Sequence, residues 1–300
     1  MTEKLPGVRS FFKYVDPETA CAILRSKSVR YSSPLKFNDP FDVQSGLHFD
    51  FDLNSLHSKV LEKIESLVVS AEQPSVDANN IWGQLVLRVR ELYSTHGFPR
   101  ERWQQEFATN FPALVSEIAA AQQKYQQHWN TLLPRIRVFC VSEHRDELLM
   151  WAHYARNHSG AVFEFRSLPD EDNPLSVAHP VLYVDKPPCF FSSTEWVEDI
   201  LSIRKMDVHA FFRNYPYVKS NHWAYEGEWR VWYPADSSDD ALHVDCPIRA
   251  SEFAGVYIGC KATAAFTSDV VRLARRSFPD GRVFQARKNQ AAYALEYDEI

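Results

Sequence analysis

The sequence predicts an α+β fold with a mixed or antiparallel β core and a helical insertion. Runs rich in β-branched and aromatic residues occur near both ends of the chain, without a regular alternation of strand and helix. Residues from about 53 to 133 carry helical periodicity instead. No G-x-G-x-x-G or Walker loop occurs, so a Rossmann-type sheet is not expected. We expect one domain over residues 1–300, with the insertion at about 53–133.

The first elements form a strand–helix–strand unit. In chain order they are a strand at 8–15, a helix at 17–27, a strand at 28–33 and a turn-rich loop at 34–42. An Asp-Pro pair opens the helix, because proline suits the first helical turn.

The insertion is expected to be helical because apolar residues recur every three or four positions. Such a pattern places them on one buried face of a helix. The two stripes are Leu56, Val60, Ile64 and Leu67, and then Leu114, Ile118, Ala121, Tyr125, Trp129 and Leu132.

The remaining elements alternate irregularly between strand and helix. Strands are expected at 135–143, 160–165, 179–185, 223–234, 253–259, 282–288 and 291–297. Helices are expected at 146–155, 192–214 and 268–278. Ser192 and Glu195 have the spacing of a capping box, in which each side chain bonds the backbone of the other.

The composition favours a globular protein of the cytoplasm. The chain has 300 residues, of which 45% are hydrophobic, and a net charge of −6 that argues against broad non-specific binding of nucleic acid. Five well-separated cysteines without a C-x-x-C pair suit reduced thiols. No apolar run of about 18 residues occurs, so we expect no membrane segment.

Two carboxylates stand one residue apart in HWAYEGEWRVWYP, residues 222–234. In a strand, Glu226 and Glu228 would point to the same face, where each disfavours ionisation of the other unless a cation or ligand compensates. This arrangement indicates a candidate site. Two alternatives stay open: an edge strand with solvated carboxylates, or an ion pair of Glu228 with Arg230 on the same face.

Four blocks carry a family resemblance. They are FFKY (11–14), RYSSPLKFNDPFD (30–42), CVSEHRDELLMWAHYARNHSG (140–160) and YEGEWR (225–230). Their identity and order resemble a bacterial domain-of-unknown-function family, number twenty-nine seventy-one, over essentially the whole chain.

The second half also resembles ADP-ribosyltransferases in layout. Those enzymes carry a serine motif on one strand, then a short helix, a strand, and a strand with Glu-x-Glu. The corresponding segments here are 140–142, the helix through Leu149 and Trp151, the strand at 161–165, and 226–228. The order matches, whereas of the serine motif only Ser142 remains.

This resemblance implies an enzyme that cleaves NAD and transfers ADP-ribose to a protein or nucleic-acid acceptor, as in a toxin or a phage-defence effector. Glu228 would stabilise the oxocarbenium-like centre and Glu226 would orient or deprotonate the acceptor. Ser142 would hydrogen-bond Glu228, and Lys13 would lie near the pyrophosphate. The first-strand arginine or histidine typical of these enzymes would correspond to Lys13 or Arg9. Tyr31 would stack on nicotinamide. The implied NAD-binding set is Lys13, Tyr14, Tyr31, Ser32, Asn38 and Ser142.

Several residues also have structural interpretations. The FNDPFD segment is rich in turn formers and could fasten a loop onto the core. His153 is read first as a surface or hydrogen-bonded structural histidine. Cys140, His144, His153 and His158 match no common zinc module, so no metal is expected.

Two other functions remain open. One is a non-catalytic domain that binds a nucleotide or a partner, since a fold does not guarantee its chemistry. The other is a metal-dependent nuclease, suggested by Asp39, Asp42 and Glu164, which form no recognisable metal motif.

Overall fold

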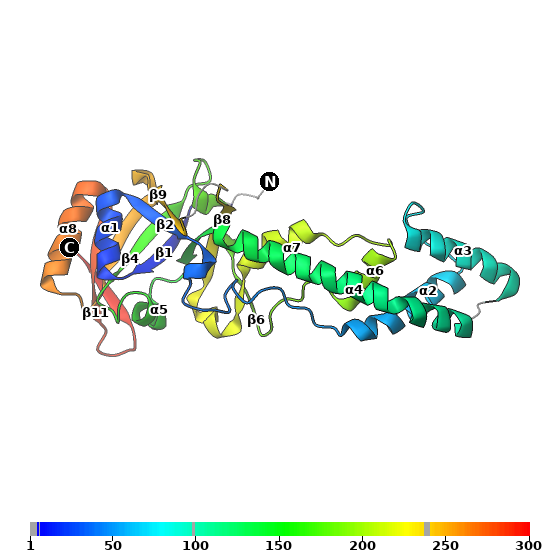
Figure 1. Cartoon of the computed structure of the whole chain (residues 1–300). Helices are drawn as coiled ribbons and strands as arrows, with labels where there is room; N and C mark the ends of the chain where they lie inside the picture. The colour runs from blue at the N-terminus through cyan, green and yellow to red at the C-terminus, as the bar shows by residue number, and fades with distance from the viewer. Residues whose placement is uncertain (1–4, 6, 98–99, 237–240) are drawn as a thin grey trace. The chain divides into compact units, whose positions relative to one another are not determined.

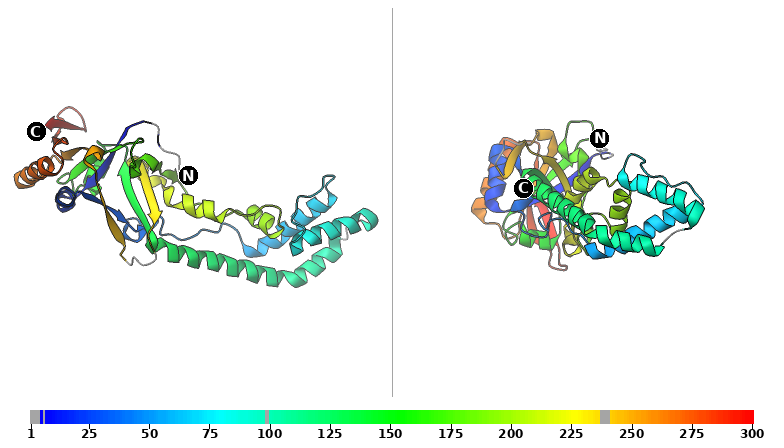
Figure 2. Two further views of the ribbon diagram at one scale, coloured as in Figure 1. Left: turned by 90° about the horizontal axis from the view of Figure 1, so that it is seen from above. Right: turned by 45° about the vertical axis from the view of Figure 1, so that its right-hand side comes forward.

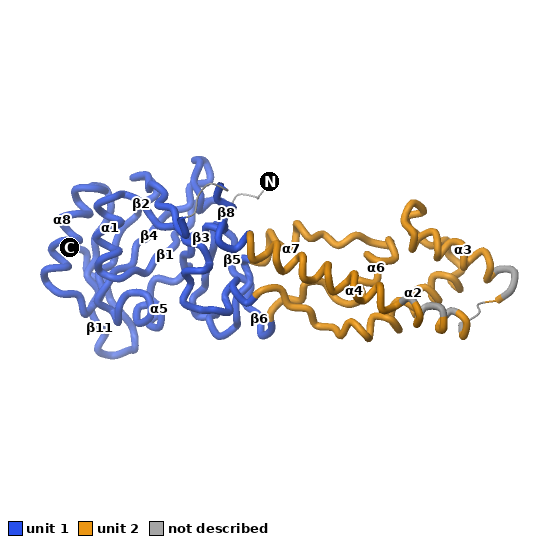
Figure 3. Tube along the Cα trace, viewed as in Figure 1, with its two compact units in different colours: residues 1–45, 132–186, 216–300 blue, residues 46–131, 187–215 orange. Residues whose placement is uncertain are grey.

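The computed structural model describes residue 5 and residues 7–97, 100–236 and 241–300. It is a mixed α+β structure with a large, mostly antiparallel sheet and several helices, as the sequence predicts. The chain forms two compact units (Figure 3). Unit 1 comprises residues 1–45, 132–186 and 216–300, and unit 2 comprises residues 46–131 and 187–215. Among the described helices, none combines the length and apolarity needed to cross a membrane.

Unit 1 contains the large sheet (Figure 1). Its strands along the main path are β12 (Leu295–Glu299), β11 (Arg282–Lys288), β10 (Phe253–Ile258), β4 (Ala161–Ser167), β1 (Arg9–Val15), β3 (Ile136–Ser142), β2 (Ser28–Ser32) and β9 (His243–Pro247). β8 (Glu228–Pro234) pairs with β3 and with β5 (His179–Pro180). The pair β10–β11 is parallel. β6 (Leu182–Val184) and β7 (Val218–Ser220) form a separate small sheet.

The two faces of the strands are covered by different helices. α1 (Pro17–Ser26) and α8 (Ala264–Ser277) pack together on one face, against alternate residues such as Phe11 and Phe163. The other face, with Tyr14 and Tyr257, receives α5 (Leu148–His153) and its buried Trp151. This alternation is the two-residue period of a strand with both faces buried.

The sheet forks at β3. Along one edge β3 pairs with β8 over its full length, from Ile136 to Ser142. Along the other edge it pairs with β2 only at Val138 and with β1 only at Ser142. The strands β1 and β2 therefore diverge opposite Cys140, and backbone groups of β3 lack strand partners at the gap.

Unit 2 is built from helices. They are α2 (Leu56–Val69), α3 (Ile81–His96), α4 (Arg100–Leu132), α6 (Ser193–Ile200) and α7 (Val208–Asn214). Trp129 of α4 is fully buried and stacks on Phe212 of α7, with ring centroids 5.5 Å apart. α4 bends along its length (Figure 2) and contains Pro112, which cannot donate a backbone hydrogen bond. The predicted helical stripes are confirmed at Leu56, Val60, Ile64, Leu114, Ile118 and Trp129, which are buried.

Several predicted elements need correction. The expected strand at 223–234 begins only at Glu228, because residues 221–226 form a 3-10 helix that ends at Gly227 in the left-handed region. The expected helix at 192–214 is broken into α6 and α7 between residues 200 and 208, although its capping box is present. The expected strand at 179–185 is split between two sheets. β7, which has three residues, and β9 were not expected.

Candidate functional site

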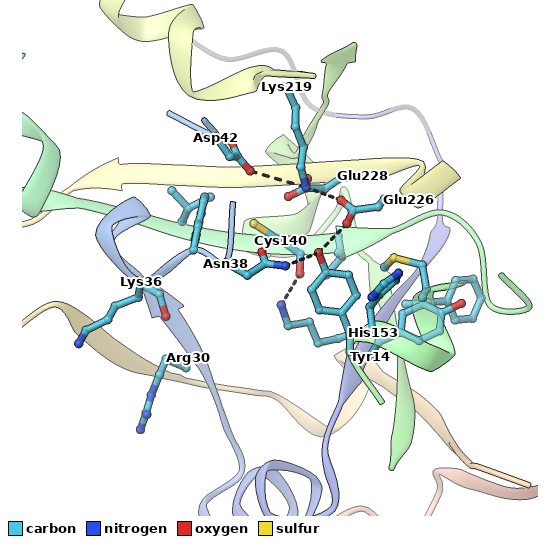
Figure 4. Close-up of a pocket in the computed structure, with 18 residues that line it drawn as sticks. Tyr14, Arg30, Lys36, Asn38, Asp42, Cys140, His153, Lys219, Glu226 and Glu228 are labelled. Carbon is cyan, nitrogen blue, oxygen red and sulfur yellow. Dashed lines mark hydrogen bonds and ion pairs between the residues drawn. The ribbon is translucent and has the colours of Figure 1, made fainter. Parts of the chain in front are cut away.

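A pocket of about 360 Å³ opens where the sheet forks. Its walls come from β1, β2, β3, the loop at 36–42, α5 and the segment from Lys219 to Glu228. Figure 4 shows how residues from these distant segments surround one space. Lys13 takes the place of a missing strand neighbour, because its Nζ donates to the backbone oxygen of Cys140 at 2.8 Å. The pocket is therefore a consequence of the diverging strands.

Arg230 anchors one wall of the pocket from behind. Its side chain is fully buried, and each of the five N–H groups of a guanidinium has an acceptor. Two bonds reach Asp42 at 2.9 and 2.6 Å, two reach Glu228 at 2.8 and 2.9 Å, and one reaches the oxygen of Pro216 at 2.7 Å. This confirms the sequence-based alternative that Arg230 pairs with Glu228, and it joins the FNDPFD loop to β8.

Lys219 joins the same cluster from β7. Its buried Nζ donates to Oε2 of Glu226, donates to Oε2 of Glu228 at 3.0 Å, and lies 3.6 Å from Oδ2 of Asp42. We call Asp42, Lys219, Glu226, Glu228 and Arg230 the ion-pair cluster. Three carboxylates face two cations, so the cluster carries one negative charge when all five groups are ionised.

Glu226 is the carboxylate of the cluster that Arg230 does not bond. Its side chain is only 2% exposed and lines the pocket. Oε1 accepts a hydrogen bond of 2.6 Å from the hydroxyl of Tyr154, the residue that follows α5. Gly227 makes this placement possible, because its φ of 48° turns the chain between the two glutamates. A Cβ at Gly227 would lie 2.6 Å from the ring of His144.

The two glutamates have opposite pKa shifts. Burial raises the pKa of Glu226, and the charge of Glu228 adds to the shift, while Lys219 only partly opposes it. Burial would also raise the pKa of Glu228, but Arg230 and Lys219 outweigh it and hold that pKa below its ordinary value. Glu228 is therefore a fixed anion, and Glu226 is the carboxyl better suited to exchange protons.

Cationic side chains line other parts of the same pocket. Lys13, Lys36 and Arg30 all contribute to its walls. Arg30 is paired with Asp245, whereas exposed Lys36 has no ion pair among the described residues. Figure 4 shows Lys36 and Arg30 on the side of the pocket away from Glu226. The pocket thus has an anionic wall and a cationic wall.

Most of the NAD-binding residues predicted from the sequence line this pocket. Lys13, Tyr14, Ser32 and Asn38 do so together with Glu226 and Glu228. The hydroxyl of Tyr14 donates to the oxygen of His144 at 2.8 Å, and Nδ2 of Asn38 donates to the hydroxyl of Tyr154 at 3.4 Å.

Three placements differ from the prediction. Tyr31 is 3% exposed, does not line the pocket, and stacks on Phe139 with centroids 5.0 Å apart. Ser142 does not bond the carboxylate of Glu228, since its hydroxyl donates to the backbone oxygen of Glu226 at 2.5 Å. Arg9, the alternative to Lys13, lies over the ring of Trp229.

The sequence reasoning missed several residues of the pocket. Asp42 and Tyr154 lie inside blocks that were singled out, yet their roles depend on partners far away in the chain. No sequence motif indicates a role for Lys219, because it is a lone lysine in the segment YVKSN. His153 is exposed and lines the pocket, with the rings of Trp223 and Tyr225 each 6.4 Å from its own.

The acids proposed for a nuclease do not come together. Asp39 accepts from the backbone nitrogen of Phe41, and Glu164 accepts from Ser10 and Tyr257, whereas Asp42 belongs to the ion-pair cluster. Within the described part of the chain, no group of three His, Cys, Asp or Glu side chains is placed to hold a metal ion.

Comparison with known proteins yields one family. The searches of curated proteins and of solved structures found no match. Residues 150–231 match the model of the family described as "Protein of unknown function (DUF2971)", which supports the family predicted from the sequence blocks. This matched region contains Tyr154 and all of the ion-pair cluster except Asp42, whereas the segments at 11–14 and 30–42 lie outside it.

Proposed function

We propose that the pocket binds NAD and that the protein cleaves its nicotinamide–ribose bond and transfers ADP-ribose to a macromolecular acceptor. One observation carries this proposal: a buried carboxyl, Glu226, lines a pocket that is also lined by the cationic side chains of Lys13, Arg30 and Lys36. NAD has the complementary polarity, with a cationic pyridinium glycoside at one end of an anionic pyrophosphate. The similarity of motif order to ADP-ribosyltransferases supports the same assignment.

The chemistry needs an anion beside the ribose. When the bond between ribose C1′ and the nicotinamide nitrogen breaks, its electron pair leaves with neutral nicotinamide, and positive charge develops on the sugar. An ionised carboxylate stabilises this charge, most strongly at a site shielded from water. The nucleophile of the acceptor then bonds to C1′ and gives its proton to the carboxylate.

Glu226 fits both tasks better than Glu228, in contrast to the roles implied by the family resemblance. Both oxygens of Glu228 are engaged by Arg230, and one of them also by Lys219. The raised pKa of Glu226, caused chiefly by burial, suits a group that accepts a proton. In this proposal Glu228 is a positioning residue that holds Lys219 against Glu226.

The remaining groups match the rest of the ligand. Lys13 and Lys36 can neutralise the pyrophosphate as point charges. The rings of Phe12, Tyr14 and His153 line the pocket and offer flat surfaces for an aromatic base. The volume of about 360 Å³ lies near the lower end of the usual range for ligand pockets, so part of NAD would extend toward the exposed mouth.

The experiment is incubation of the purified protein with NAD labelled in the adenylate moiety, with and without cell lysate or RNA. We expect nicotinamide release and label on a macromolecule. Stabilisation by NAD without release would support instead a non-catalytic nucleotide-binding protein, which the tight pairing of Glu228 also favours. Binding at 100 times Kd should add about 2.7 kcal/mol to stability. The absence of both nicotinamide release and stabilisation at millimolar NAD would refute the proposal. NAD consumption of this kind suits a toxin or a phage-defence effector.

A further inference from the structure

Three turns meet at one end of the sheet in unit 1, away from the fork. β10 and β11 are parallel, and β4 is antiparallel to β10. The turn before β4, the turn after β10 and the loop after β11 therefore lie at the same sheet end. In open sheets, ligands bind beyond the carboxyl ends of parallel strands. A second pocket of about 650 Å³ is found there.

This second pocket is lined by basic groups. Lys261 follows β10, Lys288 ends β11, and His158 lies in the turn before β4. Gln290 adds an amide group, whereas the amide of Asn289 is bonded to Glu296 and to the backbone nitrogens of Ala291 and Ala292. No Asp or Glu lines the pocket. Within the described residues, Lys261 and Lys288 have no ion pair. The second pocket shares no lining residue with the pocket at the fork.

His158 is held rigidly in this position. Arg156, Asn157 and His158 have φ values of 44°, 53° and 67°, a conformation that non-glycine residues rarely adopt. The backbone oxygen of His158 accepts from Lys261 N at 2.9 Å, and its ring stacks on Trp151 with an angle of 4° between planes. Its Nδ1 atom is buried without a hydrogen-bond partner among the described residues. Backbone strain of this kind persists only where the surrounding structure holds the chain in place.

We propose that the pocket formed by His158, Lys261 and Lys288 binds a phosphate group, either inorganic phosphate or the phosphate of a small molecule. Two ammonium groups and an imidazole line one space that no Asp or Glu lines, and a tetrahedral dianion would pair with both ammonium groups there. Burial lowers the pKa of His158, and the charges of Lys261 and Lys288 lower it further.

The test uses the full chain with ¹³C-labelled histidine, and inorganic phosphate as the probe. The Hε1 signal of His158 is assigned by its loss in His158→Gln. We expect phosphate to shift this signal saturably and to raise the pKa of His158, because a bound anion stabilises the imidazolium. Chloride at matched ionic strength should have little effect. The double variant K261Q/K288Q should weaken the apparent phosphate affinity about tenfold or more.

A matched control separates the pocket from general surface charge. Lys186→Gln removes another exposed lysine of unit 1 that does not line the pocket, and phosphate binding should be unchanged. Equal shifts with chloride, no saturable shift at millimolar phosphate, or the same affinity in K261Q/K288Q would overturn the proposal. These outcomes are independent of NAD cleavage, since the readout is a histidine outside the pocket at the fork.

Discussion

The hydroxyl of Tyr154 donates a 2.6 Å hydrogen bond to Oε1 of Glu226, a residue 72 positions away in the chain. Lys219 holds the other oxygen of the same carboxyl, so the side chain of Glu226 is fixed in orientation before any ligand enters. A hydrogen bond to a carboxylate favours its ionised form, whereas burial disfavours it. The proton affinity of Glu226 is therefore set by a balance of burial and the charge of Glu228 against Lys219 and Tyr154.

Replacing Tyr154 with Phe should move this balance. Loss of the hydroxyl donor should raise the pKa of Glu226 further, because this hydrogen bond lowers it in the native protein. The acidic limb of the pH profile for nicotinamide release should then shift to higher pH, with activity recovered at alkaline pH. Tyr225→Phe, which changes a nearby ring without a hydrogen bond to Glu226, is the control. An unshifted limb in Tyr154→Phe would show that the rate does not depend on this carboxyl.

Arg230 should be among the most important charged residues for stability. Arg230→Met leaves Asp42 and Glu228 buried without their main partner, and breaking a buried pair in this way costs about 3–5 kcal/mol. Arg287→Met is the matched control, because this strand arginine forms exposed pairs with Glu296 and Asp298 and should lose only about 0–1 kcal/mol. Urea unfolding measures both free energies, and similar losses would contradict the picture of a buried anchor.

The stability of the protein should fall in acid partly through Glu228. Its folded pKa lies below the ordinary value of 4.5, so the unfolded chain takes up this proton first as the pH falls. The contribution of Glu228 is thus complete above pH 4.5 and declines below it. Glu228→Gln should be destabilising at neutral pH, and the difference from wild type should shrink below pH 4.5. A difference that stays constant with pH would mean that Glu228 is not held as an anion.

Substitutions of Lys13 and Tyr31 should have different effects on the Kd for NAD, although the sequence predicts that both residues contact NAD. Lys13→Met removes a cation from the wall of the pocket and should raise the Kd for NAD about tenfold. Tyr31→Phe should leave the Kd unchanged, because Tyr31 packs in the core against Phe139. Calorimetric titration with NAD measures both constants. Equal effects would show that the ligand does not occupy the pocket at the fork.

The fold class and most elements could be predicted because they depend on local patterns. The aromatic and β-branched run of β1, the helical stripe of α2 and the capping box at Ser192 each follow from a pattern within one segment. The strand start at Glu228 could not be predicted, because Gly227 adopts a left-handed conformation that sequence alone does not impose. β7 was missed because three residues carry too little pattern.

The site could be predicted only in part. The pair Glu226 and Glu228 stood out because two acids so close need compensation, and the structure shows the compensating cations. Which glutamate faces Tyr154 depends on β3, β7 and α5, which meet through long-range pairing. Tyr31 and Ser142 were misplaced for the same reason. Side-chain direction at the fork depends on where β3 pairs with β1 and where it pairs with β2. This long-range pairing cannot be read from a local sequence pattern.

The most direct measurement of the central claim is nicotinamide release from NAD by Glu226→Gln, with the Kd for NAD measured on the same sample. Glutamine keeps the shape of the side chain but cannot carry the negative charge that stabilises the sugar cation. We predict that the Kd changes little while release falls by about a hundredfold or more. Native release by Glu226→Gln, with NAD still bound, would contradict the assignment of this carboxyl as the catalytic group.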